Sequence, residues 1–91
     1  MSENTPNQGT QNLVQRAMNT KETWKRVARL PKDMATFDSI EGRQIRERFY
    51  DAVIGLNSLN HGLARLYAIA YNGWVDSLPN PCECMYIHSL G

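Results

Sequence analysis

The chain has 91 residues, of which 42% are hydrophobic and 21% are charged, and its formal net charge is +1. A chain of this length makes one domain whose core supplies only about 3–5 kcal/mol, so we expect self-association to add stability. The near-neutral charge gives no general attraction to nucleic acid, and without a signal-peptide pattern or an apolar run of about 18 residues we expect a cytoplasmic protein with no membrane partner.

The chain divides into three parts by composition. Residues 1–9 are polar and predict a disordered tail, which is followed by a helical domain over 10–78 and an extended segment over 79–91. Apolar residues at helical spacing predict a first helix. It begins with Thr10 as its N-cap and ends at Leu30, just before a proline.

Part of this helix is strongly basic. Between residues 16 and 32 there are six basic side chains and one acidic side chain, Glu22, which gives a formal charge of +5. Such a surface can simply be solvated, or it can bind an anionic small molecule or the acidic surface of another protein. Its candidate binding residues are Lys21, Lys25, Arg26 and Arg29.

A second helix is predicted after a turn over 31–37. Asp38 is placed as its N-cap, and Glu41 is placed as the carboxylate of a capping box. From Ile45 to Ala70, apolar residues recur at alternating steps of four and three residues. This seam predicts a helix that packs lengthwise against another helix.

The centre of the seam is ambiguous. Poor helix formers, including Gly55 and Gly62, cluster around Asn57–Asn60. The apolar spacing nevertheless continues across them, so we expect one helix from about Ser39 to about Ser77. The predicted fold is all-α, a helical hairpin of an N-terminal helix and one long helix with an extended C-terminal tail. A break near the two asparagines would give a three-helix bundle instead.

A continuous second helix would be about twice as long as the first helix can cover, which leaves part of the seam for another copy of the chain. The two glycines in the seam region would let a second backbone approach closely. We therefore expect a homodimer or higher oligomer with these interface residues: Leu56, Leu59, Leu63, Leu66, Gly55 and Gly62.

Polar and aromatic residues near the seam form a candidate ligand site. An oligomer that holds an anionic small molecule such as a nucleotide needs hydrogen-bonding groups and rings that stack on a planar base. The candidate residues are Asn60, His61, Arg65, Tyr67 and Trp74. In the alternative interpretation these residues face water or form hydrogen bonds across a dimer.

The C-terminal segment carries four side chains that can bind soft metals. Thiolate, thioether and imidazole groups are ligands for Cu(I) or Zn, so Cys82, Cys84, Met85 and His88 form a candidate metal site. In a straight strand, however, His88 would lie about 13 Å from Cys84, which is too far to share an ion. The alternative is reduced thiols and apolar side chains packed on the helices.

No nucleophile is paired with a base, no glycine-rich phosphate loop is present and no motif identifies a family, so we expect neither an enzyme nor a cofactor. The sequence therefore predicts a non-catalytic binding protein, a small self-associating helical inhibitor or adaptor of another protein. Sequestration of an anionic small molecule and binding of a soft metal are the alternatives.

Overall fold

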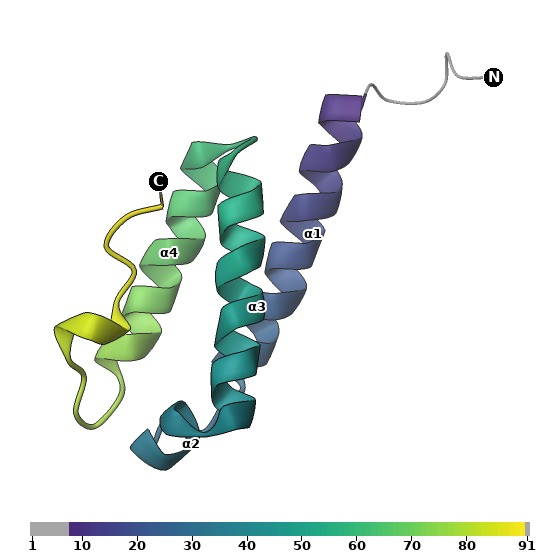
Figure 1. Cartoon of the computed structure of the whole chain (residues 1–91). Helices are drawn as coiled ribbons and strands as arrows, with labels where there is room; N and C mark the ends of the chain where they lie inside the picture. Colours follow the sequence, from purple (N-terminus) through teal and green to yellow (C-terminus); the bar gives the residue numbers. More distant parts are fainter. Residues whose placement is uncertain (1–7, 91) are drawn as a thin grey trace.

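The computed structural model describes residues 8–90, with side chains from residue 12 onward, and this part of the chain forms helices and no β-strand. The all-α prediction is confirmed. α3 lies in the middle, with α1 packed along one side and α4 along the other (Figure 1). The elements in chain order are α1 (Gln8–Ala28), α2 (Met34–Asp38), α3 (Ile40–Asn57), α4 (His61–Asp76) and the 3-10 turn η2 (Glu83–Met85).

α1 starts earlier than expected and is fixed to α3 by a buried threonine. The helix begins at Gln8, a good helix former, so the predicted cap at Thr10 is wrong, and the rest of the predicted tail lies outside the described residues. The fully buried Thr20 places its hydroxyl 2.7 Å from the carbonyl oxygen of Arg16 and 3.2 Å from that of Ala52 in α3. The hydroxyl of Thr20 is therefore satisfied across the helix pair, whereas the buried Nε1 of Trp74 has no hydrogen-bond partner among the described residues.

The expected turn over 31–37 contains the short helix α2. Asp33 caps this helix, because its carboxylate accepts a hydrogen bond of 2.7 Å from the backbone N–H of Thr36. The predicted capping box at Asp38 and Glu41 is wrong by one residue. Ser39 caps α3 instead, and its hydroxyl accepts a hydrogen bond of 2.9 Å from the N–H of Gly42.

The chain breaks at the ambiguous point of the seam, so the preferred single helix is wrong and the three-helix alternative is found. Asn60 caps α4 by accepting a hydrogen bond of 3.0 Å from the N–H of Leu63. The burial pattern changes at the break. In α4 the inward-facing positions include Ala64, Ala68, Tyr71 and Val75, whereas Leu66, which continues the seam, is 63% exposed.

The core lies between the three long helices, and the C-terminal segment returns along α4 (Figure 1). Aromatic rings fill its centre, with the ring centroids of Trp24 and Phe49 5.4 Å apart and those of Phe49 and Tyr71 5.5 Å apart. Asn72 fixes the returning segment by two hydrogen bonds with the backbone of Ile87, of 3.0 and 2.8 Å. No described helix combines the length and the apolar character needed to cross a membrane.

Candidate functional site

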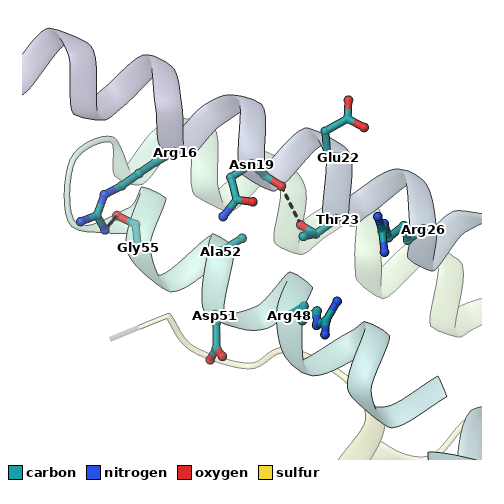
Figure 2. Close-up of a pocket in the computed structure, with 9 residues that line it drawn as sticks. All are labelled: Arg16, Asn19, Glu22, Thr23, Arg26, Arg48, Asp51, Ala52 and Gly55. Carbon is teal, nitrogen blue, oxygen red and sulfur yellow. Dashed lines mark hydrogen bonds between the residues drawn. The ribbon is translucent and has the colours of Figure 1, made fainter. Parts of the chain in front are cut away.

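A groove of about 550 Å³ runs between α1 and α3 (Figure 2). Long arginine side chains from α1 stand at both ends of the groove, whereas α3 contributes Arg48 at one end and the small residues Ala52 and Gly55 toward the other. Five of the lining residues come from α1 and four from α3: Arg16, Asn19, Glu22, Thr23, Arg26, Arg48, Asp51, Ala52 and Gly55.

At one end of the groove, Arg16 reaches across to α3. Its Nη1 donates a hydrogen bond of 2.9 Å to the carbonyl oxygen of Gly55, in the last turn of α3, where carbonyl groups lack partners within the helix. A Cβ at Gly55 would lie 2.7 Å from that nitrogen. The glycine therefore admits the guanidinium group, which uses one of its five N–H donors in this bond.

At the other end, two arginines project from opposite walls. Arg26 comes from α1 and Arg48 from α3, and both side chains are exposed (Figure 2). Among the described residues, neither guanidinium group has a hydrogen bond or an ion pair; the ion pair that is present joins Lys25 and Glu22 at 3.5 Å. Two unpaired positive charges on facing helices raise the local potential and favour an anion between them.

Acidic groups lie at the outer edges of the groove rather than at its centre. Glu22 points away from α3 and Asp51 points away from α1 (Figure 2). Between the two ends, the walls present Ala52 and the side chains of Asn19 and Thr23. The line along the centre of the groove is therefore positive at both ends and uncharged in the middle.

The structure places only one of the four predicted basic binding residues in the groove. Arg26 lines the groove, whereas Lys25 pairs with Glu22. Lys21 is exposed elsewhere on α1, and Arg29 is exposed just after its end. Arg48 was outside the predicted set, because it lies on another helix and only the packing of α1 against α3 brings it to Arg26. The sequence carried no signal for Arg48, because Glu47 and Asp51 lie close to it along the same helix.

The predicted ligand residues beside the seam do not form one site. Asn60 caps α4, and His61 Nδ1 lies 2.6 Å from Oδ1 of Asn57. Tyr67 and Trp74 pack against the phenylalanines of the core, and only Arg65 remains exposed and unpaired among these five described residues. Their role in binding a planar ring therefore has no geometry to support it.

Of the six predicted interface residues, three make contacts within the chain and three are exposed. Leu56 is fully buried, Leu63 packs partly buried against the core and Gly55 contacts Arg16, so these three are occupied within the chain. Leu59, Leu66 and Gly62 remain exposed. The break moved the second half of the seam to the outer face of α4.

The predicted metal ligands at the C-terminus are not gathered. Among residues 8–90, no three His, Cys, Asp or Glu side chains lie close enough together to hold a metal ion. Met85 packs partly buried against the core, and His88 Nε2 lies 2.7 Å from the carbonyl oxygen of Glu83. A hydrogen bond with Cys82 raises the pKa of the exposed Cys84 thiol, which disfavours the thiolate that metals bind.

A larger cavity of about 730 Å³ lies beneath the C-terminal segment, beside α2 and α3. It is lined by two arginines, Arg43 and Arg46. Arg46 is already used by the fold, because it donates a hydrogen bond to the carbonyl of Phe37 and lies 3.6 Å above the centre of that ring. Burial lowers the pKa of Arg46 and raises that of Tyr71. The carboxylates of Asp38, Glu47 and Asp51 also line this cavity, so it does not favour an anion.

Comparison with known proteins gives no identification. No family model matches the chain, and neither a curated protein nor a solved structure is significantly similar to it. The groove between α1 and α3 is therefore the basis for the functional proposal.

Proposed function

We propose that this protein is a non-catalytic binding protein that holds an anionic group of a partner protein between Arg26 and Arg48. The observation that supports this is the presence of two guanidinium groups on facing helices with no carboxylate partner among the described residues. An arginine side chain presents a planar fork of donors that matches a carboxylate or a phosphate in a bidentate way. Such a site suits an adaptor or inhibitor.

The chemistry of the groove also supports binding rather than catalysis. It is lined by no histidine, cysteine or serine, and its one hydroxyl group, on Thr23, donates to the backbone oxygens of Asn19 and Thr20 at 3.0 Å. This hydroxyl is therefore hydrogen-bonded to backbone carbonyls and not to a side-chain base that could activate it. What the groove offers a ligand is charge and hydrogen-bond donors.

Titration calorimetry with a glutamate-rich peptide at low ionic strength tests the proposal. Because each exposed arginine contributes modestly, Arg26→Ala and Arg48→Ala should each weaken binding by about two- to fivefold, and added salt should weaken it further. Arg29→Ala is the matched control, since it removes the same charge one residue beyond the end of α1 and outside the groove.

Two results would contradict this function. The first is the absence of binding at low ionic strength. The second is an equal loss of affinity in Arg29→Ala and Arg26→Ala, because this would show that the overall positive charge of residues 16–32 attracts the peptide without the groove. If inorganic phosphate competes fully for the same two arginines, the partner is a small anion rather than a protein segment.

A further inference from the structure

The groove has positive charge at both ends, not at one. Arg16 and Arg26 are ten positions apart on α1, which corresponds to about 15 Å along the helix. Arg48 joins Arg26 at one end, and Arg16 retains free donors beside its bond to Gly55 at the other. A single small anion would contact only one of these ends.

The middle of the groove sets a second requirement. Asn19, Thr23 and Ala52 leave the centre of the groove uncharged, while Glu22 and Asp51 flank it on the outside (Figure 2). An occupant must therefore be uncharged where it touches the centre. At the flanks, positive side chains on the occupant would be attracted and negative ones repelled.

Resting on the proposed function, we infer that the occupant is a helix of an acidic partner protein, with carboxylates about three turns apart on its contact face. The groove between two packed helices accepts the ridge of a third helix, which completes a four-helix arrangement. Residues about eleven positions apart lie on one face of a helix and span about 16 Å, close to the separation of Arg16 and Arg26.

The charge pattern disfavours a nucleic acid in the same groove. A nucleic-acid strand carries a negative phosphate at every nucleotide, so it would place negative charges beside Glu22 and Asp51 as well as beside the arginines. A helix can instead carry carboxylates only at the ends of the contact face. The two carboxylates of the groove thus act as a selectivity element.

Two synthetic helical peptides of identical composition test this inference. The first carries two glutamates about eleven residues apart, and the second carries them about four residues apart, both on one face. By titration calorimetry, the first should bind about two- to fivefold more tightly, and Arg16→Ala should abolish that difference. Circular dichroism of Arg16→Ala checks that the helices remain.

The outcomes separate the inference from the proposed function. If both peptides bind through Arg26 and Arg48 with equal affinity, the spacing is wrong while the anion site stands. If neither peptide binds, both fail. If Arg16→Ala weakens both peptides equally, Arg16 only supports the end of α3 and the inference is overturned.

Asp51→Asn provides an independent check that does not involve an arginine. We expect this variant to bind a short single-stranded DNA about two- to fivefold more tightly than the wild type does. Its affinity for the first peptide should stay nearly the same. Unchanged DNA binding, or a wild-type protein that binds the DNA more tightly than the peptide, would contradict the selectivity role of the carboxylates.

Discussion

At the scale of single residues, the helical glycines show how one residue type meets different environments. A Cβ at Gly42 would collide with the backbone oxygen of Thr36, and a Cβ at Gly55 would meet the mobile end of Arg16. A Cβ at Gly73 would meet nothing within 4 Å. The sequence predicted a close approach at Gly55, but not that an arginine of the same chain would make it.

Gly42→Ala and Gly73→Ala should therefore change the free energy of unfolding in opposite directions. The first forces a backbone contact and should cost about 1–3 kcal/mol. The second replaces an unconstrained helical glycine and should add up to about 1 kcal/mol. Urea unfolding followed by circular dichroism measures both, and a stabilised Gly42→Ala would contradict the packing of α2 on α3.

At the scale of elements, the sequence predicted the helices better than their ends. The apolar spacing correctly predicted helical structure on both sides of Asn57–Asn60. It could not predict the break, because Leu59, Leu63 and Leu66 keep the same spacing as the buried residues of α3. The cap at Asn60 and the inward-facing Ala64 and Ala68 determine which face of α4 is buried. Alanine occurs at both buried and exposed positions, so the sequence alone did not indicate that face.

Asn60→Ala tests whether the cap holds the break. The loss of the bond to the N–H of Leu63 should lower the free energy of unfolding by about 0.5–2 kcal/mol. Asn60→Ser or Asn60→Asp should retain most of the stability, because both can cap a helix. Equal stability of Asn60→Ala and the wild type in urea would contradict a capped start of α4.

The C-terminal segment makes a pH-dependent contact with α4. The hydroxyl of Tyr86 donates to Asp76 at 2.6 Å, and this bond raises the pKa of Tyr86 to about 12. Because the folded pKa lies above the usual value of about 10, the contact stabilises the fold below pH 10 and is lost as the pH rises through 12. Ultraviolet titration of the phenolate should show Tyr86 returning toward pH 10 in Asp76→Asn; an unchanged titration would contradict the bond.

At the scale of the whole molecule, the outer face of α4 carries a row of exposed apolar side chains. Leu66 and Ile69 are 63% and 59% exposed, and Gly62 and Gly73 lie above and below them at helical spacing. The fold gives no reason for these exposed residues. Self-association, which the sequence predicted through a longer seam, remains a prediction at this smaller surface.

Sedimentation at tens to hundreds of micromolar protein tests self-association. Leu66→Glu should shift the protein toward monomer, because burying a charge opposite an apolar side chain is unfavourable. Ile40→Glu is the control, since Ile40 is 78% exposed on α3 and away from this row. A wild type that is monomeric throughout this range would rule out the contact.

The molecule as a whole places two separate surfaces on one small scaffold, the arginine groove between α1 and α3 and the outer face of α4. Only the first offers unpaired charges from two helices, and the sequence could not predict it because Arg48 faces Arg26 only when α1 and α3 pack together. The basic character of α1 indicated an anionic partner, and the position of Arg48 defines where it binds.

The most direct test of anion binding in this groove is nuclear magnetic resonance of the arginine side chains during titration with the peptide that carries two separated glutamates. We predict that the Nε–Hε signals of Arg26 and Arg48 shift together and saturate with one affinity, while that of Arg29 stays in place. Signals that shift equally for all three arginines, or for none of them, would contradict the account.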